Sequence, residues 1–218
     1  MHINKNGLAI CTALLLVGLI FLLFGRAFPS TSVSIEGSVY TINSLTISKD
    51  IYYRQTLNNC APYSVMAVLN ILNNEQIDPE VLSKEISWRI YKNLTFPQGL
   101  IDLLHKYGIK TKEYTLYRLS SQNKIDWLKG KIDKRTPIIL LIEIKHIKHY
   151  FTILGYDEHG FMIYDSLQDK RKDDPRKTIS DNETYSGNRY YTNEQVIDLW
   201  NEGGYKIFFR NWAIVCSK

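Results

Sequence analysis

The segment 55–64 constrains this chain more than any other, because it puts a cysteine at the start of an expected helix. Pro62 suits the first turn of that helix, which would begin at Cys60. A cysteine there lies among unpaired backbone N–H groups at the positive end of the helix dipole, which favours thiolate over thiol. Gln55 precedes it and can aim its side-chain amide at the oxyanion that forms when a thiolate attacks a carbonyl. The segment therefore offers a nucleophile and an oxyanion donor, although a buried structural cysteine is the simpler interpretation of a lone cysteine.

Two β-branched and aromatic runs further along the chain predict a hairpin that would supply a base. Folding the chain about the turn between them brings His149 within a residue or two of Asp165. An imidazole oriented by a carboxylate is the base that a cysteine nucleophile requires. Taken singly, the histidine could be a strand-edge residue and the aspartate a turn residue, but their order after the glutamine and the cysteine favours catalysis. The first run, the turn and the second run are residues 149–156, 157–160 and 161–164.

With these residues the sequence resembles the double-glycine (bacteriocin-processing) peptidase family, within the papain-like cysteine proteases. The resemblance extends over roughly residues 48–216. It implies that Cys60 is the nucleophile and His149 the base. It also implies that Asp165 orients the histidine and that Gln55 donates to the oxyanion. The matching pieces are Gln55, Asn59-Cys60-Ala61-Pro62, Phe96-Pro97-Gln98-Gly99-Leu100, the strand 149–157, Tyr164-Asp165-Ser166, and a closing set at 191–192, 199–200 and 212–215.

The sequence departs from the family pattern at two positions. Ala61 stands where the family usually has glycine after the nucleophile, and Ser166 stands where a proline commonly follows the acid. Neither change removes a catalytic atom. The alanine could tighten the subsite beside the thiolate, which bears on the range of substrates.

The order of the expected elements predicts an α+β fold, with amino-terminal helices packed on an antiparallel sheet and a cleft between them. This is also the papain-like arrangement that the resemblance implies. We expect helices over 60–73, from 78–79 to about 91, from 97 to 107 and from 120–121 onward, and another near 193–201. We expect strands over 109–117, 136–144, 149–156, 161–164 and 206–216, with a polar loop over 166–190.

The amino end carries an uncharged apolar run over residues 7–25, long enough to cross a bilayer as a helix. Lys5 and the terminal amine precede the run, and only Arg26 follows it before Lys49, so a small positive bias weakly favours an internal amino terminus and an external domain. A cleaved secretory signal is the alternative, and it would give a secreted protein. We therefore expect a membrane anchor or signal segment over 1–26, a linker over 27–47 and a papain-like cysteine peptidase domain over 48–218.

Composition argues against several other classes of protein. The chain has 27 Lys and Arg against 22 Asp and Glu, and its densest charge cluster, 169–177, mixes signs without aromatic residues. This is typical of a solvated loop rather than of a nucleic-acid interface. No Cys/His spacing suits structural zinc, and no glycine-rich phosphate loop occurs. We expect no cofactor, no metal and no nucleic acid, and we expect a peptide or protein substrate and the membrane as partners.

Three functional classes fit these residues. A cysteine peptidase is the first, and an acyl or amide transferase using the same triad is the second. A catalytically silent peptide-binding domain is the third, but the presence of all four catalytic residue types argues against it.

Overall fold

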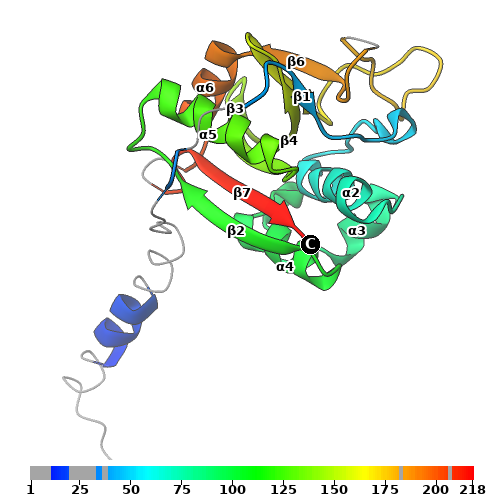
Figure 1. Ribbon diagram of the computed structural model, residues 1–218. Coiled ribbons are helices and arrows are strands. Elements are labelled where there is room, and N and C mark those ends of the chain that lie inside the picture. Colours follow the sequence, from blue (N-terminus) through cyan, green and yellow to red (C-terminus); the bar gives the residue numbers. More distant parts are fainter. Residues whose placement is uncertain (1–10, 20–32, 36–38, 182–183, 206–207) are drawn as a thin grey trace, which may run out of the picture.

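The computed structural model describes residues 11–19, 33–35, 39–181, 184–205 and 208–218. Within them, seven strands form one sheet in which every pairing is antiparallel (Figure 1). The strand order is β2-β7-β3-β4-β5-β6, and β1 pairs with β4. The predicted α+β class with an antiparallel sheet is confirmed. The strands are β1 (Asn43–Ser44), β2 (Lys110–Thr115), β3 (Ile138–Ile144), β4 (Ile147–Tyr156), β5 (Gly160–Tyr164), β6 (Arg189–Thr192) and β7 (Trp212–Ser217).

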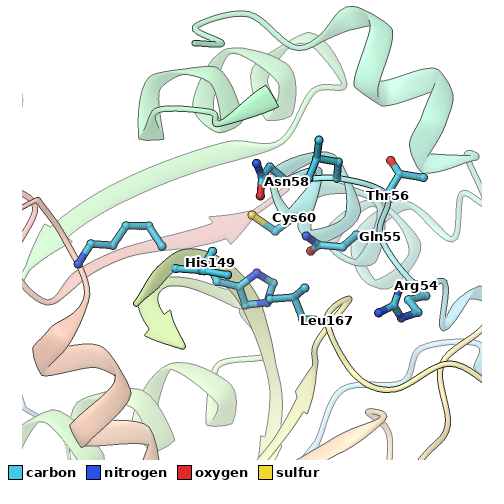
Figure 2. A pocket seen from close by; sticks show the side chains of 10 residues that line it. Arg54, Gln55, Thr56, Asn58, Cys60, His149 and Leu167 are labelled. Atoms are coloured by element: carbon cyan, nitrogen blue, oxygen red, sulfur yellow. The ribbon is translucent and has the colours of Figure 1, made fainter. Parts of the chain in front are cut away.

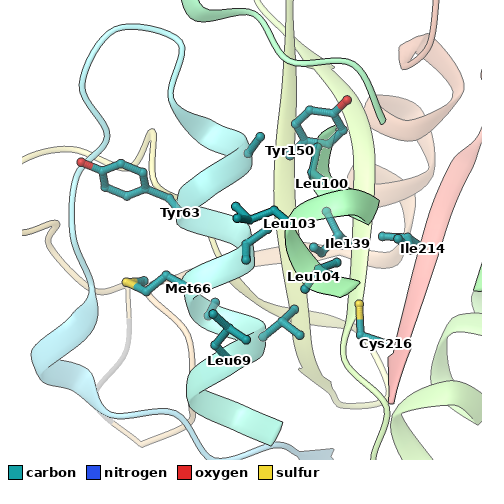
Figure 3. Close-up of a cluster of buried hydrophobic side chains, with 14 of the residues drawn as sticks. Tyr63, Met66, Leu69, Leu100, Leu103, Leu104, Ile139, Tyr150, Ile214 and Cys216 are labelled. Carbon is teal, nitrogen blue, oxygen red and sulfur yellow. The ribbon is translucent and has the colours of Figure 1, made fainter. Parts of the chain in front are cut away.

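Helices cover both faces of the sheet because successive strand side chains point to opposite sides. In β3, Ile139 and Leu141 belong to the apolar cluster shared with α2 and α4 (Figure 3), whereas Ile138 and Leu140 belong to the cluster shared with α5 and α6. The expected layer of amino-terminal helices is therefore present, and a second helical layer lies behind the sheet. The helices are α2 (Cys60–Asn73), α3 (Pro79–Glu85), α4 (Pro97–Lys106), α5 (Ser121–Asp133) and α6 (Asn193–Glu202), with short 3-10 turns at η1 (Lys49–Ile51) and η2 (Tyr91–Asn93).

Helix α2 has the bounds that the sequence predicts, and it is the central support of the fold. Pro62 lies in its first turn, and Asn74 ends it in the left-handed conformation with φ 58°, its N–H bonded to the carbonyls of Leu69 and Asn70. Every residue from Cys60 to Asn70 is buried. A helix buried on all sides has little freedom to move, so it fixes the position of its first residue.

Two predicted elements are shorter than expected. Helix α3 ends at Glu85 rather than near 91, because Ile86 is extended and Trp88 has a φ of 55° that no right-handed helix accommodates. The last strand begins at Trp212 rather than 206, since Tyr205 and Phe208 already pair with each other in an isolated bridge. The short strands β1 and β6 were not predicted, and β1 lies inside the segment 27–47 that we expected to be a linker.

About half of the predicted anchor over 7–25, residues 7–10 and 20–25, lies outside the described residues. Its described part, 11–19, is helical, and the large apolar side chains there are exposed. Within the described ranges, the structure has no helix of the length and apolar character that crossing a bilayer requires.

Candidate active site

Cys60 is the first residue of α2, and its helix end faces a pocket. The residue before it, Asn59, makes no side-chain cap to the helix. Its side chain instead accepts a hydrogen bond from Arg89 Nη2 at 2.7 Å and donates one to Thr56 Oγ1 at 2.7 Å. The first N–H groups of α2 are therefore left without a side-chain cap, as a helix end that stabilises an anion requires.

His149 and Asp165 form a buried pair across the β4–β5 hairpin. Thr152 pairs with Tyr164 in the sheet, which brings the start of β4 beside the residue that follows β5. His149 Nε2 lies 2.8 Å from Asp165 Oδ1, and the two side chains are 1% and 0% exposed. The hairpin and the proximity of these residues agree with the sequence-based expectation.

Asp165 is held by more partners than His149. Arg189 Nη1 donates to Oδ2 at 2.9 Å, and the Leu167 N–H donates to Oδ1 at 2.8 Å. The side chain of Asn188 accepts from the Asp165 N–H and donates to its carbonyl, each at 2.8 Å. Burial alone would raise the pKa of the Asp165 carboxyl, but His149, the Leu167 N–H and Arg189 outweigh it and lower the pKa to about 2.

The pair also controls the charge of the histidine. Burial lowers the pKa of His149, but the Asp165 carboxylate and then Cys60 raise it to about 9. The imidazole is therefore protonated at neutral pH. Its Nδ1 is buried and makes no hydrogen bond within the described part of the chain. Because Nε2 is engaged by Asp165, Nδ1 is the ring nitrogen that remains available to a further partner.

Gln55 is fixed to the segment after Asp165. Its backbone N–H donates to the Ser166 carbonyl at 2.9 Å, and its side-chain Oε1 accepts from Ser166 Oγ at 2.7 Å. Gln55 Nε2 has no hydrogen-bond partner among the residues that the structure describes. The two N–H groups of the Gln55 side-chain amide are thus available to a group bound in the pocket.

The pocket has a volume of about 250 Å³, and Cys60, Gln55 and His149 all line it (Figure 2). Figure 2 shows the Gln55 amide and the His149 ring lying beside the Cys60 sulfur. Asp165 lies behind the histidine rather than on the pocket wall. The structure therefore brings all four sequence-predicted residues together. The lining residues are Arg54, Gln55, Thr56, Leu57, Asn58, Cys60, Ile147, Lys148, His149 and Leu167.

The sequence matches the Peptidase C39-like family over residues 47–196. The chain belongs to this family. It is therefore an enzyme of the cysteine peptidase class, as the sequence resemblance implied. A comparison with curated protein sequences finds no match to this C39-like peptidase.

Solved structures share the fold of this C39-like peptidase at low sequence identity. A Bacillus anthracis protein assigned as a C39-like peptidase has a TM-score of 0.51 and 16% identity, over 81% of this chain and 98% of the other. A double glycine motif protease from an AMS/PCAT transporter, solved with its leader peptide, has a TM-score of 0.51 and 11% identity, over 85% and 100%. At such identities the likeness concerns the fold alone.

Sequence reasoning missed the residues that support the site of this C39-like peptidase. Arg189 and Asn188 bind Asp165 from β6 and the residue before it, at the end of a segment predicted to be a polar loop. Only the aromatic and β-branched residues of β6 could have indicated a strand there, and the strand is four residues long without alternating burial. Ser166 was noted as a departure from the family pattern, but its contact with Gln55 was not foreseen.

Proposed function

We propose that this C39-like peptidase cleaves peptide bonds with Cys60 as nucleophile, His149 as base, Asp165 as the acid that orients the histidine, and Gln55 as oxyanion donor. The observation that carries the proposal is the buried 2.8 Å contact between His149 and Asp165 at the wall of a pocket that Cys60 shares. The uncapped amino end of α2 supports a thiolate at Cys60.

In the first chemical step, the Cys60 thiolate attacks the carbonyl carbon of the scissile bond, and the carbonyl oxygen becomes an oxyanion. Gln55 Nε2 donates to that oxyanion. The tetrahedral intermediate then collapses to a thioester as the C–N bond breaks, and His149 Nδ1 gives its proton to the leaving amine.

In the second step, a water molecule attacks the thioester carbonyl while His149 takes its proton. Collapse of the new tetrahedral intermediate releases the carboxylic acid and restores the thiolate and imidazolium. The raised pKa of His149 suits this cycle, because the histidine starts protonated at neutral pH. The lowered pKa of Asp165 keeps its carboxylate ionised throughout.

The proposed substrate is a peptide that reaches the thiolate in an extended form. The pocket is partly walled by Leu57 and Ile147, two residues that are 64% and 49% exposed. Exposed apolar side chains beside a nucleophile can pack against apolar residues of a bound peptide. A structural neighbour was solved with a leader peptide, which supports a peptide ligand for this fold.

We further propose that residues 7–25 attach the protein to a membrane with the peptidase domain, residues 48–218, on the extracytoplasmic side. The support is the charge-free apolar run and the exposure of Leu14, Leu15 and Leu16 in its described part. Secretion after cleavage of this segment is the alternative. Residues 27–47 would connect the two parts.

The triad is tested by three variants of the full-length protein, assayed on a peptide library with products identified by mass spectrometry. Cys60→Ala and His149→Ala should each abolish hydrolysis while the protein stays folded, because nucleophile and base act as a unit. Asp165→Asn should retain residual activity, since the imidazole loses its orientation but not its nitrogen atoms. Hydrolysis by Cys60→Ala at the wild-type rate would refute the proposal.

A further inference from the structure

The residue after the catalytic acid makes two contacts with the proposed oxyanion donor. Ser166 accepts the Gln55 N–H at its carbonyl, at 2.9 Å, and its hydroxyl lies 2.7 Å from Gln55 Oε1. Ser166 is 1% exposed and does not line the pocket, so its hydroxyl has no direct access to a bound substrate. Its side chain can affect the reaction only through a neighbour.

The hydroxyl contact determines which end of the Gln55 amide faces the pocket. An amide has one accepting oxygen and one donating nitrogen at nearly equal positions, so it can turn over unless a partner holds one end. With Oε1 bonded to Ser166, Nε2 is the end left toward the pocket. The opposite orientation would direct the carbonyl oxygen toward the cysteine, where it would repel both a thiolate and a developing oxyanion.

We propose that Ser166 is a positioning residue that orients the Gln55 amide, so that Nε2 and not Oε1 meets the oxyanion. The proposal rests on the assignment of Gln55 as oxyanion donor. The two-residue unit Asp165-Ser166 then supports both halves of the reaction, because its aspartate holds the base and its serine holds the donor. The serine, one of the two departures from the family pattern, would thus have a role of its own in this chain.

Two small reagents separate this role from a general effect on the thiolate. p-Nitrophenyl acetate acylates the cysteine through a tetrahedral oxyanion, as sulfur attacks the carbonyl and p-nitrophenolate leaves. Iodoacetamide alkylates the same sulfur by direct displacement of iodide, with no oxyanion. An oxyanion donor and any residue that orients it should therefore affect the first reaction and not the second.

The experiment measures both rate constants in a single turnover for the full-length protein and its variants. Gln55→Ala should slow acylation by about 10²–10³. Ser166→Ala should slow it by about tenfold, the effect of one lost hydrogen bond. Neither should change alkylation. Ser166→Thr, which keeps a hydroxyl, should recover acylation, and in the Gln55→Ala background Ser166→Ala should have no further effect.

Ser64→Ala is the matched control, because Ser64 is equally buried at 1% exposure and its hydroxyl donates to the Tyr150 carbonyl rather than to Gln55. It should leave both reactions unchanged. Equal slowing of acylation and alkylation by Ser166→Ala would overturn the positioning role. So would a further slowing of acylation, as large as in the wild-type background, when Ser166→Ala is added to Gln55→Ala. Acylation at the wild-type rate in Cys60→Ala, measured in a Cys11→Ser background that removes the exposed second thiol, would instead refute the proposed nucleophile itself.

Discussion

At the scale of single residues, the site is organised around the charge of one buried carboxylate. Asp165 has no exposed surface, yet its two oxygens accept from His149, Leu167 and Arg189. A buried charge is tolerated only when it is paired and hydrogen-bonded, and this one is both. The ionised Asp165 in turn keeps the histidine protonated.

The raised pKa of His149 predicts how stability depends on pH. An unfolded histidine titrates near pH 6.5 and the folded one near 9, so the stabilising pair is complete below about pH 6.5 and is lost as the pH rises through 9. The difference in unfolding free energy between wild type and His149→Gln should therefore shrink from pH 6.5 to pH 9, by on the order of 2–3 kcal/mol. Urea titrations across this range measure it.

The control for that experiment is His159→Gln, because the His159 side chain is exposed in the turn after β4. It should leave the pH dependence of unfolding unchanged. A constant difference between wild type and His149→Gln across the range would contradict the coupling of His149 to Asp165.

Arg189 leads to a second prediction at the residue scale, which concerns activity at acid pH. Arg189→Met removes the 2.9 Å donor to Asp165 Oδ2, and the pKa of the carboxyl should rise because one of the groups that lowers it is gone. In the pH profile of the rate of peptide hydrolysis, the acid limb should then move to higher pH. The shift should be modest, since the Arg189 side chain is 28% exposed and partly screened by solvent.

A matched control for Arg189 is Arg176→Met. Arg176 also pairs with an aspartate, Asp78 at 3.3 Å, but both side chains are exposed, at 69% and 45%, and Arg176 is not among the groups that lower the pKa of Asp165. The acid limb of the pH–rate profile of Arg176→Met should coincide with that of wild type. Coincidence of the Arg189→Met and wild-type profiles would show that Arg189 has no influence on the site.

At the scale of elements, the sequence predicted those helices and strands whose ends are set by nearby residues. Helix α2 was predicted with its observed bounds, because Pro62 and the asparagines at its end are strong start and stop signals. The β4–β5 hairpin was predicted because its turn residues interrupt two β-branched runs, and Asp157 Oδ1 accepts the N–H groups of His159 and Gly160 there.

Elements that depend on distant contacts were not predicted. The two residues of β1 are a strand only because they pair with Tyr156 and Gly155, more than 100 positions later. The candidate site likewise has a part that the sequence predicts and a part that it does not. Its four candidate catalytic side chains have recognisable residue types and order, whereas the supporting contacts of Ser166 and Arg189 join residues that are 111 and 24 positions apart. No periodicity or turn signal reports such contacts.

Gly155 provides the element-scale prediction, because β1 crosses it closely. A Cβ at this position would lie 2.7 Å from both the Asn43 carbonyl oxygen and the Ser44 Cβ, so Gly155→Ala must displace β1. We expect a loss of about 1–3 kcal/mol in unfolding free energy, the usual cost of overpacking. Because the pocket lies elsewhere, the rate of Cys60 alkylation should not change.

The comparison for Gly155→Ala is the same substitution in a chain that begins at residue 48 and so lacks β1. There the alanine should cost much less, since the atoms it would meet are absent. An equal loss of unfolding free energy in both chains would show that the alanine clashes with atoms outside β1.

At the scale of the whole molecule, the fold joins two layers at the pocket. The proposed nucleophile belongs to a buried helix on one face of the sheet, the proposed base belongs to strand β4, and Asp165 directly follows strand β5 (Figure 1). Neither part is a mobile loop, so the relative position of sulfur and imidazole follows from core packing. The segment before the helix contributes to this core as well, since Leu45 and Ile47 are buried.

The attachment of this unit to a membrane is the last prediction. The run 7–25 would extend about 28 Å as a helix at 1.5 Å per residue, close to the thickness of a bilayer's hydrocarbon core. The full-length protein should therefore remain in the membrane fraction at high salt and at alkaline pH. A chain starting at Ser34 keeps Leu45, Ile47 and all four proposed catalytic residues, so it should be recovered in the soluble fraction with Cys60 still reactive toward p-nitrophenyl acetate. Recovery of a mature chain beginning between residues 27 and 31 would instead identify a cleaved secretory signal, and the proposed peptidase chemistry would be unaffected.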